Sequence, residues 1–93
     1  MPTSLSARKR VRQSEKRRVR NRRIKSALRT QIRKVEVALD SGDAEAARRE
    51  FQAAVKAIDK AVTKGVLHRN TAGRRKSRLA ALVNTMAAQA QEG

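Results

Sequence analysis

Large apolar side chains are nearly absent from the first quarter of this chain, and that absence limits what it can fold into. The chain contains 18 leucine, isoleucine, valine and phenylalanine residues, of which only Leu5, Val11 and Val19 precede Ile24. Burial of apolar side chains is the dominant favourable term in folding, so residues 1–23 can contribute little to a core. The other 15 must form it, and 93 residues make one small domain.

Positive charge has the opposite distribution along the chain. Residues 1–34 contain 14 Lys or Arg and one acidic residue, a net charge of +13. Residues 35–64 contain five basic and six acidic residues, net −1, and residues 65–93 contain five and one, net +4, which gives +16 for the chain. We therefore interpret residues 1–23 as a basic arm attached to a body of more balanced charge.

Two breaker motifs divide the chain into three helical segments. Ser41-Gly42-Asp43 ends one helix and starts another, because glycine suits the left-handed position after a helix and Asp43 can cap the next helix. Lys64-Gly65 is a second stop signal. No strand-like alternation occurs, so the sequence predicts an all-α fold: a three-helix bundle with an extended basic N-terminal helix.

The predicted single domain, residues 1–93, places helix one over about residues 6–40, with residues 24–40 packed in the bundle. Helix two is predicted over 43–64 and helix three over 68–88. The apolar residues of each segment recur at helical spacing and are expected to face the core. They are Ile24, Leu28, Ile32, Val35 and Leu39 in the first segment, Ala47, Phe51, Ala54, Val55, Ile58, Ala61 and Val62 in the second, and Leu79, Leu82, Val83, Met86 and Ala90 in the third.

The residue types needed for most catalytic chemistry are missing. The chain has one histidine, His68, and no cysteine, tryptophan or tyrosine, so a pocket of titratable groups, a thiolate metal site and a disulfide framework are not expected. No run approaches the roughly 20 apolar residues of a membrane span, and the N-terminus lacks the apolar segment of a secretory signal. We expect no enzyme activity, cofactor, metal, small-molecule substrate or membrane partner, but a soluble intracellular protein that binds a polyanion.

The arm is the part that must meet the polyanion. Ten of the sixteen residues 8–23 are Lys or Arg, and Glu15 is the only acidic one. Like charges one helical turn apart, such as Arg8 and Arg12, oppose the helix when the arm is free. We predict that residues 1–20 are largely disordered in solution, that they become helical on a phosphate backbone, and that binding weakens steeply with salt. A membrane-surface helix would need an apolar stripe opposite the charges, which Val11 and Val19 do not supply.

The residues by themselves leave the kind of nucleic acid open. A basic-region zipper is disfavoured, because the stripe of helix one runs for only two heptads before Gly42. Aromatic platforms for stacking single strands are absent. The remaining features are consistent with a protein that recognises the backbone and shape of folded RNA. A histone-like DNA-compacting architectural protein is equally consistent with the charge.

Two blocks of the sequence resemble a known family. The first is SARKRVRQSEKRR over residues 6–18 with Asn21, and the second is KGVLHRNTAGRRKSRL over residues 64–79. Over about residues 4–86 the chain resembles the family of bacterial small-subunit ribosomal protein number twenty. In that family Ala is usual where this chain has Gly73.

The resemblance implies a three-helix bundle with a long first helix, bound directly to small-subunit ribosomal RNA. It also implies an assembly protein of the cytoplasmic ribosome at the foot of the small subunit, where it bridges the 5′ domain and the long penultimate helix of the RNA. Neighbouring small-subunit ribosomal proteins are the other implied partners, and an obligate homo-oligomer is not expected.

The predicted RNA-binding residues are polar and basic side chains of the arm, of the next turns of helix one and of the start of helix three. They are Arg8, Lys9, Arg10, Arg12, Gln13, Ser14, Lys16, Arg17, Arg18, Arg20, Asn21, Arg22, Arg23, Lys25, Arg29, His68, Arg69, Asn70, Arg74, Arg75, Lys76, Ser77 and Arg78.

Some residues near these positions have alternative predicted roles. Glu15 is expected to hold a neighbouring arginine, since a carboxylate cannot face phosphate unaided. His68 either caps or packs against the start of helix three or contacts RNA, and Asn70 or Thr71 is a further candidate cap.

Overall fold

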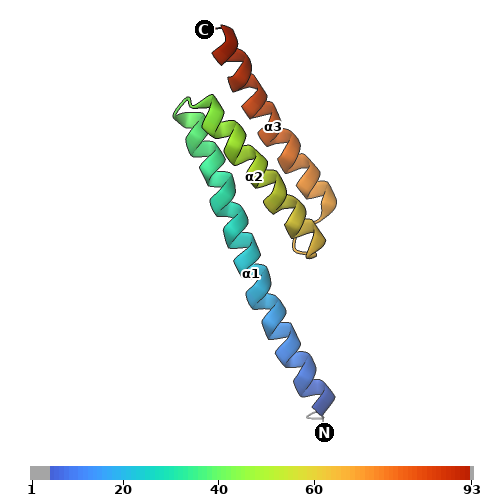
Figure 1. Ribbon diagram of the computed structural model, residues 1–93. Coiled ribbons are helices and arrows are strands. Elements are labelled where there is room, and N and C mark those ends of the chain that lie inside the picture. The colour runs from blue at the N-terminus through green and yellow to red at the C-terminus, as the bar shows by residue number, and fades with distance from the viewer. Residues whose placement is uncertain (1–4, 93) are drawn as a thin grey trace.

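The computed structural model describes residues 5–92, with side chains for residues 5–89, and consists of three helices in this part of the chain. They are α1 (Leu5–Asp40), α2 (Ala44–Thr63) and α3 (Arg69–Glu92), joined by two short turns (Figure 1). The helices run up, down and up, and no strand occurs in the described residues. The predicted all-α, three-helix fold is confirmed.

Both turns are built on glycine with a positive φ, at 76° for Gly42 and 74° for Gly65. After α1, the N–H of Asp43 donates to the carbonyl of Ala38 and that of Gly42 to Leu39, both at 3.2 Å. The turn after α2 repeats this pair of bonds, from Val66 to Ala61 at 2.9 Å and from Gly65 to Val62 at 3.0 Å. These are two Schellman motifs, which satisfy the last carbonyls of each helix and require a residue that tolerates the left-handed region.

The start of α2 is capped as the sequence predicts. The side chain of Asp43 accepts a hydrogen bond of 3.0 Å from the N–H of Ala46, and Glu45 lies in the first turn. The predicted range 43–64 thus includes α2 with its two capping residues. At the other end of the chain, α3 continues to Glu92, beyond the expected end at residue 88, because the alanine-rich tail contains no helix breaker before Gly93.

The core is small and forms mainly where α2 packs against its two neighbours. Its centre is Val35 of α1 and Ile58 of α2, both fully buried. The remaining buried residues are Leu28, Ala38, Ala47, Ala54, Ala61, Ala72, Leu79 and Val83. Phe51 and Met86 are half-buried and pack against this cluster. Five of these ten buried residues are alanine, and this small side chain lets the helices approach closely.

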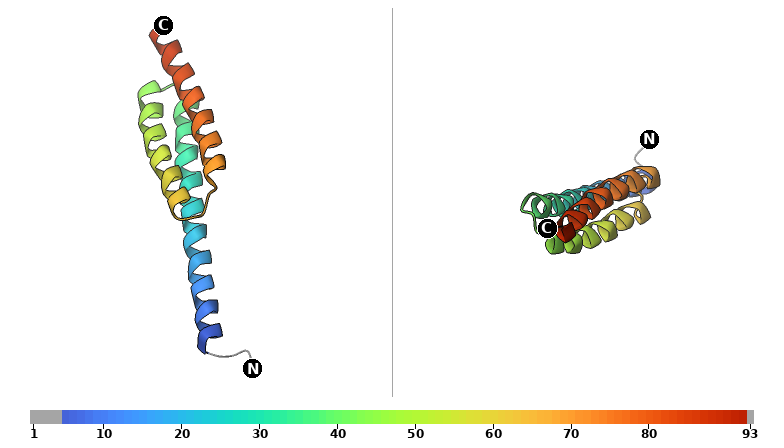
Figure 2. Two further views of the ribbon diagram at one scale, coloured as in Figure 1. Left: turned by 90° about the vertical axis from the view of Figure 1, so that its right-hand side faces the viewer. Right: turned by 90° about the horizontal axis from the view of Figure 1, so that it is seen from above.

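One residue of the predicted core is on the surface. Leu82 is 47% exposed, so its placement in the core was wrong. The reason is local to the seam between two helices: Leu82 lines an open hollow between α1 and α3, while its neighbour Val83 is buried. Further along, the end of α3 extends past the turn that joins α1 and α2 (Figures 1 and 2). The side chain of Ala90, also predicted to face the core, lies outside the described residues.

The arm extends well beyond the body. The molecule measures 71 × 22 × 14 Å and has a radius of gyration of 18.4 Å, whereas a compact chain of this length would have about 12 Å. The 36-residue helix α1 is roughly 54 Å long at 1.5 Å per residue, against about 30 Å for α2. Figure 2 shows the N-terminal half of α1 continuing past the turn that joins α2 and α3.

The same glycine-to-alanine change should have opposite effects at two positions. A Cβ at either Gly65 or Gly73 would meet no atom within 4 Å, but only Gly65 has a positive φ. We expect Gly65→Ala to lower the free energy of unfolding by about 1–2 kcal/mol through backbone strain. Gly73→Ala, within α3, should raise it by about 0.5–1 kcal/mol through helix propensity. Urea denaturation of the two variants would measure both, and a loss of stability in Gly73→Ala would contradict this account of α3.

Candidate nucleic-acid interface

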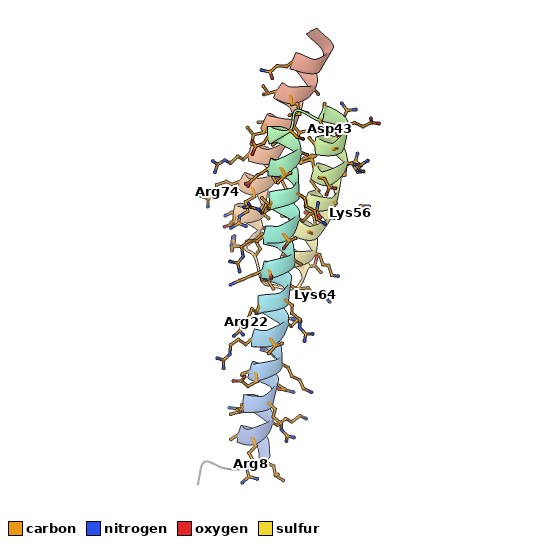
Figure 3. All side chains as sticks on the ribbon, turned by 90° about the vertical axis from the view of Figure 1, so that its left-hand side faces the viewer. Arg8, Arg22, Asp43, Lys56, Lys64 and Arg74 are labelled. Atoms are coloured by element: carbon orange, nitrogen blue, oxygen red, sulfur yellow. The ribbon has the colours of Figure 1, made fainter. Side chains whose placement is uncertain are left out.

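Every described residue from Arg8 to Arg20 is exposed. Because basic residues occupy successive positions, their side chains leave the helix in all directions, as Figure 3 shows between the labelled Arg8 and Arg22. The two apolar residues in this stretch, Val11 and Val19, are 62% and 43% exposed and lie on no packed surface. The arm therefore has no face that could dock on an apolar surface.

The single carboxylate of the arm pairs with a cation on its own helix. Glu15 accepts a hydrogen bond from the guanidinium of Arg18, one turn away, and both side chains are well exposed. This is the arrangement expected for Glu15. An exposed pair of this kind contributes little to stability, so its main effect is to restrict the orientation of one guanidinium.

Arg20 lies where the arm meets the body and has a contact that the sequence did not predict. Its Nη2 donates to the carbonyl oxygen of Lys64 at 3.2 Å and to Oδ1 of Asn21 at 3.3 Å. Lys64 is the C-cap of α2, so a cation sits at the negative end of that helix, where it is favoured. The two residues are 44 positions apart, and no local pattern relates them.

Of the predicted neutral RNA-binding residues nearby, Gln13 and Ser14 are exposed and Asn21 is half-buried.

A basic ridge continues from the arm along α1 on the side that faces α3. Its members are spaced by three or four residues and so share one face of the helix. They are Arg18, Arg22, Lys25, Arg29 and Arg33. All five are exposed. Arg33 was not among the predicted RNA-binding residues, although its position four residues after Arg29 is the signal that would have included it.

Helix α3 divides its basic cluster between two surfaces. Arg75 and Arg78 line a hollow opposite Arg29 and Arg33 of α1, whereas Lys76 turns toward α2. Its Nζ lies 2.8 Å from Oδ1 of Asp59 in an ion pair.

The other predicted residues of α3 are open to solvent. Arg69, Asn70, Arg74 and Ser77 are exposed, and the labelled Arg74 projects away from the body in Figure 3. The structure thus brings Arg75 and Arg78 together with the α1 ridge and places Lys76 apart from them, in contact with a carboxylate.

His68 caps α3. Its backbone carbonyl accepts from the N–H of Ala72 at 2.9 Å, and its Nδ1 accepts from the N–H of Asn70 at 3.1 Å. These are the two bonds of an N-cap residue. The predicted alternative, a cap from Asn70 or Thr71, was wrong, because both residues lie inside α3. The imidazole is exposed, so its surface remains accessible beside Arg69.

Other kinds of site have no support in the described part of the chain. No group of three or more His, Asp or Glu side chains there could hold a metal ion. No polar or charged side chain is buried among the described side chains. Among residues 5–92, no helix has an apolar stretch long enough to cross a membrane.

Comparison with known proteins identifies a consistent set of relatives. The family described as ribosomal protein S20 matches residues 2–84. A protein of Natranaerobius thermophilus is 51% identical over 87 residues, which cover 94% of this chain and 99% of the relative. One of Pelotomaculum thermopropionicum is 56% identical over 86 residues, 92% of this chain and 98% of the relative. Both relatives are named small ribosomal subunit protein bS20.

The contribution of His68 as the N-cap of α3 can be measured separately from any contact with RNA. We expect His68→Ala to lower the free energy of unfolding by about 1 kcal/mol, because the N–H of Asn70 loses its acceptor. His68→Asn should restore most of it, since asparagine is among the best capping residues. Urea denaturation of both variants without RNA measures the cap. Equal losses in the two variants would show that the hydrogen bond from Asn70 contributes nothing.

Proposed function

Because the chain belongs to the ribosomal protein S20 family, we propose that it binds small-subunit ribosomal RNA directly, through the arm and through the ridge that continues from it. Membership of this family gives the chain a structural role in the small ribosomal subunit. The ribosome of the bacterial cytoplasm is then its location, and neighbouring small-subunit proteins are its other partners. The proposed role is assembly and architecture, without catalysis or a cofactor.

The observation that carries this proposal is the exposed arm. Ten cations within sixteen residues lie on a helix that projects from the body and has no apolar face (Figure 2). Such a helix gains nothing from burial against protein. In contact with RNA its cations replace the ions condensed on the phosphates, and release of those ions drives binding.

The shape of the molecule suggests how binding organises RNA. The arm and the α1–α3 side of the body are joined by one continuous helix, so an RNA segment on the arm and a second on the body would be held at a fixed separation. Contacts of this kind go mainly to phosphates and riboses, and they position the RNA without reading its sequence. The protein would thus tie together RNA segments that are distant in sequence.

Removal of most of the arm tests this proposal. The truncation should end at residue 19, so that Arg20 keeps its bond to Lys64. Residues 1–19 contain seven Lys or Arg, and all buried residues follow Ile24, so the body should remain folded. We expect most of the affinity for small-subunit ribosomal RNA to be lost. The slope of log K against log salt should fall by up to about five to six.

A binding titration at several salt concentrations measures both quantities, with duplex DNA of random sequence as the comparison. Circular dichroism of the truncated chain verifies that the body is still helical. Equal affinity of the full-length chain for DNA and ribosomal RNA would favour the DNA-compacting alternative. An unchanged salt slope after truncation would show that the arm does not carry the RNA contact.

A further inference from the structure

The hollow between α1 and α3 has both a cationic and an apolar lining, and binding of the RNA backbone alone would require only the cations. Ile32, Leu79 and Leu82 provide apolar surface, and the charged lining comes from Arg29 and Arg33 of α1, Arg75 and Arg78 of α3, and Glu36. Its volume is about 600 Å³, within the range of roughly 300–1,000 Å³ typical of ligand pockets. Both helices contribute cations, so an anion between them would be approached from two sides.

A second hollow continues this one toward the turn between α2 and α3. It has a volume of about 330 Å³ and an apolar lining from Leu28, Val66 and Leu67. Arg29 and Arg75 line both hollows, so the two form one trough along the seam of α1 and α3, with a pair of arginines at its middle. We call this feature the α1–α3 trough.

We infer that the α1–α3 trough binds an unpaired nucleotide of the RNA, with the base on the apolar surface of Leu82 and Ile32 and the adjoining phosphates on the arginines. This inference rests on the proposed function and specifies a site for it. It adds two features to the predicted RNA-binding surface: an apolar contact centred on Leu82, and Arg33 as a phosphate or base ligand.

The exposed side chain of Leu82 indicates that the trough binds a nucleobase as well as phosphate. Leu82 is 47% exposed and lines this hollow together with four arginines. Its apolar surface makes no favourable contact with a hydrated phosphate or with water. One face of a nucleobase can cover the leucine, while a guanidinium plane stacks on the other face. Paired bases in A-form RNA are stacked on one another, so only a bulge, loop or end can supply such a face.

Charge decides between an RNA and a protein occupant. Arginines outnumber carboxylates in the main hollow by four to one, and the second hollow adds Lys25 and no carboxylate. An amphipathic helix of a partner protein would need a strongly acidic edge to fit, whereas every nucleotide brings a negative charge. The trough also continues the basic ridge of the arm, so an RNA strand leaving the arm can enter it without crossing an acidic surface.

Site-directed cross-linking tests the inference directly. The natural chain has no cysteine, so Leu82→Cys provides a unique attachment point for a short photoreactive group. Val37→Cys is the matched control, because Val37 is 57% exposed and lines a hollow between α1 and α2 that has only Arg33 in common with the α1–α3 trough. Each variant is assembled into reconstituted small subunits and irradiated. We expect the group at residue 82 to cross-link to an unpaired nucleotide of the small-subunit ribosomal RNA, and the group at residue 37 to give no such product.

Three results would overturn the inference: a cross-link from residue 82 to base-paired RNA, one to a ribosomal protein, or none above the Val37→Cys control. The affinity of the unmodified chain for the same RNA, measured in parallel, tests the proposed function separately. RNA binding without the expected cross-link removes the trough site and leaves the proposed function intact, whereas loss of RNA binding by the unmodified chain removes both.

Affinity measurements distinguish the apolar contact from the ionic one. We expect Leu82→Gln to weaken binding of small-subunit ribosomal RNA roughly tenfold through the loss of apolar surface buried against the base, with the salt slope unchanged, and Leu82→Met to retain affinity. Arg33→Gln should reduce the slope by about 0.7–0.9. Full affinity in Leu82→Gln would overturn the base contact, and thermal melting of each variant verifies that the fold is retained.

Discussion

Repulsion among the cations of the arm is the constraint on which the rest of the structure depends. Seven Lys or Arg within residues 8–18 surround a single helix, and neighbours one turn apart oppose the helical state. Because this segment cannot be buried, the large apolar residues are assigned to the body, where α2 packs between its two neighbours around Val35 and Ile58. The structure shows the arm in its helical form (Figure 1), and a polyanion is the partner that would stabilise that form.

Much of the fold could be predicted from the sequence because its signals are local. Gly42, Gly65 and Asp43 act on their own turns, and each one ends or starts a helix where the pattern indicates. Periodicity identified the buried faces of α1 and α2, but it placed Leu82 in the core. Leu82 is exposed because α3 packs mainly against α2 and leaves an open hollow beside α1. That is a property of the whole packing arrangement rather than of α3 itself.

The candidate site was predicted by residue type, while its arrangement depends on long-range contacts. Composition identified the cations, but it could not show that Arg20 contacts the end of α2, that Lys76 pairs with Asp59, or that Arg33 lines the same hollow as Arg75 and Arg78. Each of these facts requires the relative positions of two helices. Basic side chains of the same type therefore differ in role. Arg20 and Lys76 contact other parts of the body, whereas the other cations of the arm and those of the α1–α3 trough are exposed to solvent.

The central claim is that the helix of the arm depends on RNA while the body does not, and hydrogen exchange of individual backbone amides tests it most directly. With small-subunit ribosomal RNA bound, we predict that amides of residues 9–19 are protected. Without RNA they should exchange near the rate of an unstructured chain, while those around Val35 and Ile58 stay protected in both states. Strong protection of residues 9–19 in the free protein would contradict the account, because the helix would then form against its own charge without a polyanion.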